Sequence, residues 1–307
     1  MLNKIQLAFN KILVTGNGFD LNLGLKTSYQ DFVNSSFFKK LCDDKNELAI
    51  FIQKINKKNN WANIESQLKI YANQEDKLNK IDKEKLFNEF IVLKNALTTY
   101  LRDEECRFLN LIDTGDSLSK TIAFDLVRNA HKESSYPTFG KIISFNYTDV
   151  LLNYCYPGTY LYIHGSLVDN NIVFGVEDGG VDPKFAFLNK SDHHAYGPVN
   201  LRDEVENAEE IHFFGCALGE TDDTQFKPVF EYLTSRDSRS GFKKRKKIVF
   251  YVFGKEGYYS LRNNLLRHTK NRVGELKVNN QVIFYDVSGE NLKEIDQAWL
   301  NSFQDYP

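Results

Sequence analysis

The apolar positions of the chain follow two patterns, and the change between them divides the sequence. From about residue 28 to residue 131, apolar residues recur at helical spacing between Lys and Glu residues. Examples are Leu86, Phe87, Phe90, Ile91, Leu93, Leu97 and Leu101. Positions three and four apart share one helix face, so this stretch predicts amphipathic helices with solvated charged faces. We expect a helical insertion over approximately residues 28–135.

From residue 141 the pattern changes to short apolar runs that end in turn residues. These runs are KIISFN, TYLYIHG, NIVFGV, EIHFFGCALG, KKIVFYVFG and QVIFYDVSG, and a similar run at residues 11–15 precedes the helical stretch. Runs that are apolar on both faces favour a largely parallel sheet with helices on both sides. The sequence therefore predicts an α/β, Rossmann-like fold, in which residues 1–307 form a single domain interrupted by the helical insertion.

Composition adds bounds on partners and location. The 307 residues are 42% hydrophobic, enough for a large core, and the formal net charge of −2 provides no basic face, which disfavours nucleic acid as a partner. No apolar run has the length of a signal peptide or a membrane span, so we expect a cytoplasmic protein. The four cysteines contain no C-x-x-C pair, so neither a zinc ribbon nor a disulfide framework is indicated.

Two polar clusters are weak candidates for a functional site. The basic run from Lys243 to Lys247 lies between a polar segment and a strand, which favours a solvated loop over a contact with nucleic acid or a phage component. His193 and His194 are adjacent and lack the i, i+4 spacing of a helical metal site. We therefore predict no metal.

The first strand leads into a glycine loop. Residues 12–20 read ILVTGNGFD, so a buried strand breaks into Gly16, Asn17 and Gly18 before an apolar residue and an acid. Such a turn lets backbone amides at the start of the next helix point at a pyrophosphate. The third glycine of the dinucleotide fingerprint is missing, because its position holds Leu21, and glycine pairs at turns without a ligand are common.

Further polar groups follow the later strands, where ligands bind in open α/β sheets. In SFNYTDVLL, Asn146 follows the strand, and Tyr147, Thr148 and Asp149 lead into a helix. The alternative to a role in the site is that Thr148 or Asp149 only caps this helix. In YLYIHGSL, His164 ends the strand, and a satisfied structural histidine is the alternative.

A third such strand end is HFFGCALGETDD. Gly215 ends the strand, and Asp222 and Asp223 open a possible helix. The alternative here is a loop followed by a capped helix.

These motifs together resemble the bacterial AbiH proteins of phage abortive infection. The resemblance runs from about Ile12 to Asp223 and rests on GNGFDLNLGLKTSYQDF at residues 16–32, NWANIE at residues 60–65, SFNYT and YIHGS. It implies an antiphage abortive infection protein.

AbiH proteins are in turn remotely similar to the sirtuin-like NAD-binding fold, in which a Gly-x-Gly loop, an Asn after a strand and a His before Gly surround the nicotinamide end of NAD. Here the matching residues are Gly16, Gly18, Asn146 and His164. The paired cysteines of deacetylating sirtuins are absent, which disfavours deacetylation. Whether Thr148 or Asp149 takes the place of the acid that follows the Asn stays open.

The resemblance implies NAD as substrate, hydrolysed to nicotinamide and ADP-ribose so that host NAD is depleted, with no cofactor required. Cleavage develops oxocarbenium character at the anomeric carbon, while nicotinamide leaves neutral and needs no acid. Asn146 would hold the water or a ribose hydroxyl through its carbonyl oxygen, and a neutral His164 would accept the proton.

The remaining candidates are binding residues. They are Gly16, Asn17, Gly18, Phe19 and Asp20 of the glycine loop, Asp149, Gly165, Ser166, Gly215 and Glu65. Asn17 and Asp20 would reach a ribose or the nicotinamide amide, although Asp20 has helix capping as its alternative. Glu65 would hang over the cleft if the insertion acts as a lid, and its alternative is a surface position.

Two other functions remain open at this point. One is a non-catalytic nucleotide-sensing module that binds NAD, ADP-ribose or another nucleotide as a signal. The other is an enzyme acting on nucleic acid, with affinity that falls steeply with salt. Partners implied by a role in defence are a phage-derived trigger, a partner defence protein, or further copies of the chain in a homo-oligomer.

Overall fold

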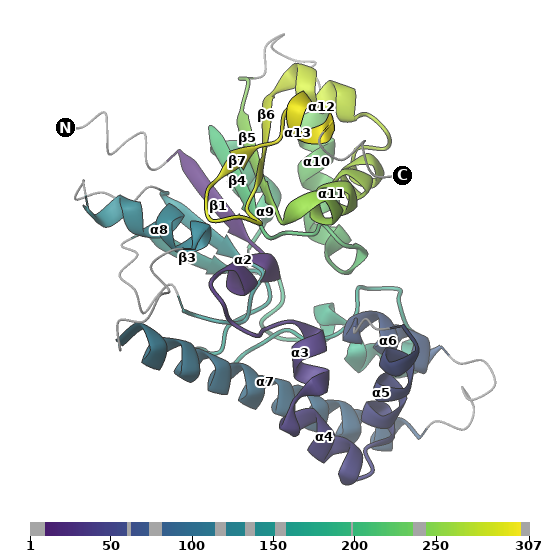
Figure 1. Ribbon diagram of the computed structural model, residues 1–307. Helices are drawn as coiled ribbons and strands as arrows, with labels where there is room; N and C mark the ends of the chain where they lie inside the picture. Colours follow the sequence, from purple (N-terminus) through teal and green to yellow (C-terminus); the bar gives the residue numbers. More distant parts are fainter. Residues whose placement is uncertain are drawn as a thin grey trace.

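A parallel sheet with helices on both faces forms one half of the molecule, and a group of helices forms the other (Figure 1). The computed structural model describes residues 10–59, 63–73, 82–113, 121–132, 139–150, 158–197, 199–235 and 244–301. The strands in these ranges are β1 (Lys11–Thr15), β2 (Lys141–Ser144), β3 (Thr159–Tyr162), β4 (Glu210–Phe214), β5 (Lys247–Val252), β6 (Gln281–Asp286) and β7 (Lys293–Glu294).

The strand order identifies the topology. It is β3-β2-β1-β4-β5-β6-β7, with β1 to β6 parallel and the short β7 antiparallel to β6. This is the Rossmann order, in which the chain leaves β1 toward β2 on one side and later returns to add β4 on the other. The strand order reverses between β1 and β4, and ligands of such sheets bind outside the carboxyl ends of the strands at this switch point. The predicted α/β, Rossmann-like class is confirmed.

Alternation along the strands explains why both faces are covered. In β1, Ile12 and Val14 point to one core and Leu13 points to another. In β5, Ile248 and Phe250 join the first core, and Val249 joins the second. Because both faces are apolar, each needs a layer of helices.

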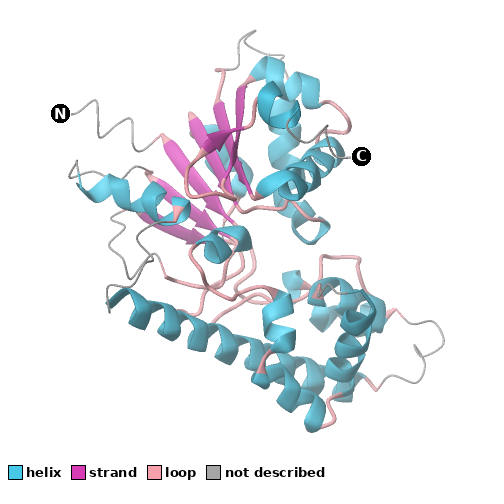
Figure 2. Cartoon of the chain, in the orientation of Figure 1, coloured by secondary structure: helices cyan, strands magenta, loops and turns pink. Residues whose placement is uncertain are grey.

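Two sets of helices supply these layers (Figures 1 and 2). One face is covered by α9 (Leu201–Asn207), α10 (Asp223–Thr234), α11 (Gly254–His268) and α12 (Val273–Asn279). The other is covered by α2 (Asn17–Asn22) and α8 (Ile122–Lys132). The short α13 (Gln297–Asn301) places Trp299 against Tyr258 of α11.

The helical insertion builds a core of its own. It comprises α3 (Tyr29–Asn34), α4 (Ser36–Asp43), α5 (Glu47–Asn59), α6 (Ile64–Ala72) and the long α7 (Lys83–Asp113). The helices expected over residues 28–135 are thus present, but α8 packs against the sheet, where Ala123 joins Leu13. No helix within the described ranges is both long enough and apolar enough to span a membrane.

One predicted strand is wrong. The run NIVFGV at residues 171–176 forms no strand, and only Val176 makes an isolated bridge, with Asn189. Its apolar side chains Ile172, Phe174 and Val176 pack into the core of the insertion instead. The segment is buried by helices and not by neighbouring strands, which a run of apolar residues cannot distinguish.

Candidate active site

A cavity of about 430 Å³ lies where the loops after β1, β2 and β4 meet the insertion. Its walls come from both halves of the molecule. The polar and small residues that line it include Gly16, Asn17, Asp20, Thr27, Tyr29, Asn63, Glu65, Asn146, Tyr147, Thr148, His164, Lys190, Gly215, Thr221, Asp222, Ser260 and Asn264. This size lies within the range of about 300–1,000 Å³ typical of small-molecule sites.

The glycine loop is joined to the end of β4. Gly16 N donates to Phe214 O at 2.9 Å, and Gly18 N donates to Gly215 O at 3.1 Å. A Cβ on Gly18 would lie 2.6 Å from Gly215 Cα, and Gly215 itself has a φ of +66°. Close packing of two strand ends is therefore sufficient reason for these glycines, and these two amides serve the fold.

Asn146 is locked in one orientation on the loop that follows β2. Its Nδ2 donates to Gly16 O at 3.1 Å and to Asp20 Oδ1 at 2.7 Å. Because a backbone carbonyl only accepts, the amide nitrogen must face Gly16, and Oδ1 is the atom left for a ligand. Thr148 donates to the other oxygen of Asp20, so one buried carboxyl group organises both side chains.

Asp20 is 2% exposed, and its position has an electrostatic consequence. Burial raises the pKa of this carboxyl to about 7, although hydrogen bonds from Thr148 and Asn146 act in the opposite direction. Asp20 therefore changes its charge near neutral pH, directly beside Asn146.

His164, which follows β3, is paired with Asp222 of the 3-10 helix η5 (Glu220–Asp222). The distance from His164 Nε2 to Asp222 Oδ1 is 2.7 Å, and the ring of Phe145 contacts the imidazole with centroids 5.5 Å apart. The other ring nitrogen, Nδ1, is buried and has no hydrogen-bond partner among the described residues. An ionised Asp222 only accepts, so the nitrogen that bonds it, Nε2, carries a proton.

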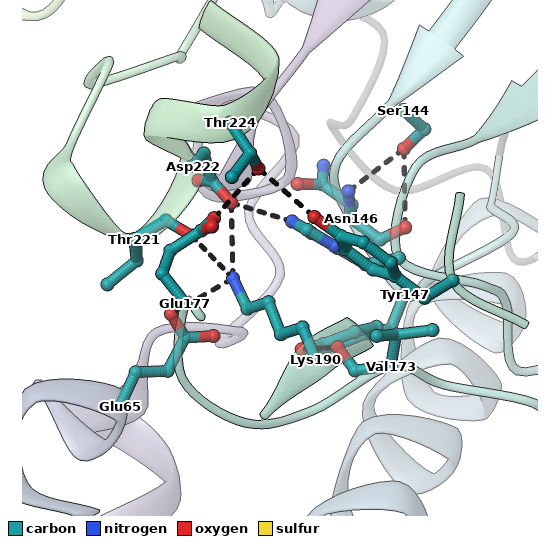
Figure 3. A network of polar contacts seen from close by, with 12 residues as sticks. Glu65, Ser144, Asn146, Tyr147, Val173, Glu177, Lys190, Thr221, Asp222 and Thr224 are labelled. Carbon is teal, nitrogen blue, oxygen red and sulfur yellow. Dashed lines mark hydrogen bonds and ion pairs between the residues drawn. The ribbon is translucent and has the colours of Figure 1, made fainter. Parts of the chain in front are cut away.

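Lys190 lies between two carboxylates (Figure 3). It belongs to the 3-10 helix η4 (Lys190–Asp192), and its Nζ lies 3.2 Å from Asp222 Oδ1 and 3.3 Å from Glu65 Oε2. Nζ also donates to Thr221 O at 2.7 Å. Burial alone would raise the pKa of Asp222, but Lys190 and His164 outweigh it and hold this pKa below its ordinary value.

Tyrosine and glutamate side chains complete this wall. Tyr29 of α3 donates to Glu65 Oε1 at 3.0 Å, and Tyr147 donates to Val173 O at 3.1 Å. Burial raises the pKa of Glu177, whose Oε1 accepts from Thr224, to about 7. Glu65 and Asp222 both pair with Lys190, so this ion cluster contains two carboxylates and one ammonium group.

The structure brings most of the sequence-predicted residues to this cavity. Those that line it are Gly16, Asn17, Asp20, Glu65, Asn146, His164 and Gly215. Gly18, Phe19, Asp149, Gly165 and Ser166 are not in its wall. Glu65 is 6% exposed, so the alternative of a surface helix glutamate is wrong.

The structure also separates the two residues considered for the acid position after Asn146. Thr148 lines the cavity and bonds Asp20. Asp149 is fully buried, with Oδ2 accepting from Val168 N at 2.9 Å, and its role is to hold the loop after β3. Trp61 of the NWANIE segment lies outside the described residues, whereas Asn63 caps α6 and lines the cavity.

Sequence reasoning missed Lys190 and Tyr29, and it placed Asp222 at the start of a possible helix without giving it a role in the site. Lys190 has no local signal, because it lies between the segment KFAFLN and the residues SDHH, which contain neither a glycine turn nor a strand end. Its partner Glu65 is distant in the chain, and only the fold joins them.

The basic run is engaged in local contacts. Within the described part of it, Lys244 pairs with Glu209, Lys247 pairs with Glu210, and Lys246 is buried against backbone carbonyl groups. The run is therefore not a wholly solvated loop. Lys243 lies outside the described residues.

The adjacent histidines are likewise held by local contacts. His193 stacks on His194, and its Nε2 lies 2.8 Å from Lys94 Nζ. In the described ranges no group of three or more His, Cys, Asp or Glu residues is arranged to hold a metal ion.

The family follows from a match over most of the chain. The sequence model of a family described as "Bacteriophage abortive infection AbiH" matches residues 12–243. The chain belongs to the AbiH family. This membership indicates a role in phage abortive infection. Searches of curated proteins and of solved structures gave no match.

The AbiH match contains the central residues of the cavity. Asn146, His164, Lys190 and Asp222 all lie within residues 12–243, as does the insertion that supplies Glu65. Ser260 and Asn264 on α11 lie beyond the AbiH match and form a separate part of the wall.

Proposed function

We propose that this AbiH protein hydrolyses NAD to nicotinamide and ADP-ribose, and that depletion of NAD is how it acts in abortive infection. The proposal includes a remote relationship to sirtuin-like NAD-binding proteins. The observation that carries it is the placement of Asn146 and His164 in one cavity at the switch point of a Rossmann-like sheet. Ligands of such sheets bind at that point.

The polar groups suit the hydrolysis of an N-glycosidic bond. Water attacks the anomeric carbon, a carbon–oxygen bond forms, and the bond to nicotinamide breaks with its electron pair passing to the ring nitrogen. Nicotinamide then leaves neutral. In this proposal the proton of the water passes to Nδ1 of His164, which has no hydrogen-bond partner among the described residues, while Oδ1 of Asn146 orients the water or a ribose hydroxyl.

The charge of the cavity also fits this chemistry. The nicotinamide ring of NAD is a cation in the substrate, and positive charge moves from it onto the ribose in the transition state. Glu65 and Asp222 share the single ammonium of Lys190, which leaves excess negative charge beside His164. Fixed carboxylates in a water-poor wall stabilise a developing cation more strongly than bulk water does.

The test uses purified protein incubated with NAD, with nicotinamide and ADP-ribose quantified by chromatography. We expect equal amounts of both products, and a loss of rate of about 100-fold or more in His164→Ala and in Asn146→Ala. The control is His212→Ala, because His212 is also buried but bonds Tyr251 and Glu210 away from the cavity. Equal rates in the wild type and His164→Ala would refute the proposal.

A second candidate function is a nucleotide-sensing module without turnover. It is favoured by one observation, which is that many polar groups of the cavity are satisfied internally. The Gly16 and Gly18 amides bond the end of β4, and Nδ2 of Asn146 bonds Gly16 O and Asp20. Stoichiometric binding of NAD or ADP-ribose by calorimetry, with no product formed, would favour this function.

A further inference from the structure

Lys190 is placed at the centre of the site, yet its ammonium is not available to a ligand. It is 1% exposed, and Nζ contacts Asp222 Oδ1, Glu65 Oε2 and the carbonyl oxygen of Thr221. Two of its three donors bond Asp222 Oδ1 and the Thr221 carbonyl, and the ion pair with Glu65 lies within 3.3 Å of the same nitrogen. Whatever Lys190 does for the chemistry, it does through its partners.

The partner that reaches the reacting group is Asp222. A single oxygen, Oδ1, accepts from Lys190 Nζ at 3.2 Å and from His164 Nε2 at 2.7 Å. Two carboxylates with no lysine between them would draw a second proton onto the imidazole. The histidine would then be a cation with N–H groups on both nitrogens, and Nδ1 could no longer accept a proton.

We propose that Lys190 is a positioning residue that fixes His164 in the neutral state with the proton on Nε2, so that Nδ1 keeps the lone pair that the proposed hydrolysis uses. This inference deepens the proposed function and rests on it for its kinetic consequence. Because Glu65 comes from α6, the arrangement also makes the protonation of His164 depend on the seating of the helical insertion. Loosening of the insertion would remove one anion from Lys190.

Other titratable groups also lie beside Lys190 and Asp222. Glu177 and Tyr147 lie close enough to Lys190 to act on its charge, and the charge of Asp222 acts on the Cys216 thiol. Burial raises the pKa of Glu177 to about 7 and raises the pKa of the Cys216 thiol. Cys216 is therefore neutral at pH 7. Glu177 adds at most a partial negative charge, and the positive charge of Lys190 balances it.

The first arm of the test reads the imidazole directly and needs no turnover. Nitrogen-15 NMR of histidine-labelled protein, with the His164 signal assigned from its loss in His164→Ala, reports which ring nitrogens are protonated. In the wild type at pH 7 we expect a proton on Nε2 and none on Nδ1. A proton on Nδ1 in the wild type would overturn the proposal, even if no lysine variant folds.

The same measurement is made on Lys190→Met with Lys246→Met as its matched control. Lys246 is also a buried lysine, but it donates to carbonyl groups of Glu206 and Ala208 far from the cavity. We expect both nitrogens of His164 to be protonated at pH 7 in Lys190→Met, and the wild-type pattern in Lys246→Met. An unchanged His164 signal in Lys190→Met would contradict the proposal.

The second arm is the pH profile of NAD hydrolysis. In Lys190→Met we expect kcat at pH 7 to fall at least tenfold with little change in KM, and to recover as pH rises and His164 loses its extra proton. Lys190→Arg, which keeps the charge, should retain the wild-type profile. A loss that is equal at every pH indicates a merely structural lysine. If the wild type forms no nicotinamide, the proposed function fails, whereas the NMR arm still decides the role of Lys190.

Discussion

Asn146 and His164 both line the cavity, and each has one polar end held by the protein and one polar end without a hydrogen bond among the described residues. Nδ2 of Asn146 bonds Gly16 O and Asp20, and Nε2 of His164 bonds Asp222. Their acceptor atoms, Oδ1 and Nδ1, are therefore oriented without a ligand present. Preorganisation of this kind lowers the cost of positioning water in the transition state.

The raised pKa of Asp20 gives a prediction for stability. Burial raises this pKa to about 7, so the folded protein holds the proton between about pH 4 and pH 7, where the unfolded chain has released it. The stability that neutral Asp20 contributes is thus present at low pH and is lost as pH rises through about 7. The expected slope is up to roughly 1.4 kcal/mol per pH unit.

Asp20→Asn isolates this effect, because an amide keeps an acceptor for Asn146 and lets the Thr148 hydroxyl accept in turn. We expect the unfolding midpoint of the wild type to fall relative to Asp20→Asn between pH 4 and pH 7, since all other groups titrate alike in both proteins. Parallel midpoint curves, measured by thermal unfolding across that range, would show that Asp20 is ionised throughout.

At the scale of elements, the sequence predicts those features that local pattern determines. β1, β2, β4 and β5 follow from apolar runs that alternate between two cores, and α7 follows from its helical spacing. The strand-end rule also brings Asn146 and His164 together. The segment 171–176 was mispredicted because its burial comes from the insertion, and Lys190 was missed because its partners are far away in the chain.

The contact between the glycine loop and the end of β4 is expected to be sensitive to any added side chain. Gly215→Ala places a Cβ 2.3 Å from Phe19 N at a φ of +66°, so we expect a loss of about 2 kcal/mol or more in unfolding free energy. The control is Gly274→Ala in α12, where a Cβ meets nothing within 4 Å and alanine favours the helix. Urea unfolding in which both variants behave alike would mean that this contact is not rigid.

At the scale of the whole molecule, the ion cluster connects the two halves. Glu65 belongs to the insertion, Asp222 follows β4, and Lys190 joins them within one wall of the cavity (Figure 3). Removing one member of a buried ion group is costly because it leaves charges without a partner. We therefore expect the ion cluster to stabilise the fold in addition to its proposed effect on the protonation of His164.

Lys190→Met should accordingly destabilise the protein more than Glu65→Gln. The first leaves two carboxylates facing each other, at a cost of about 3–5 kcal/mol, whereas the second leaves Lys190 with Asp222 and the Thr221 carbonyl. The difference should shrink at low pH as the unpaired carboxylates take up protons. Urea unfolding at pH 7 and pH 5 measures it, and equal midpoints for the two variants at pH 7 would contradict the connection.

The function proposed for this AbiH protein is the removal of NAD through His164 during infection. The most direct measurement is the NAD and ADP-ribose content of cells that express the wild type, His164→Ala or His212→Ala, with and without phage. We predict loss of NAD and gain of ADP-ribose in the wild type and in His212→Ala, and neither in His164→Ala. Growth arrest by the wild type with NAD unchanged would contradict the account.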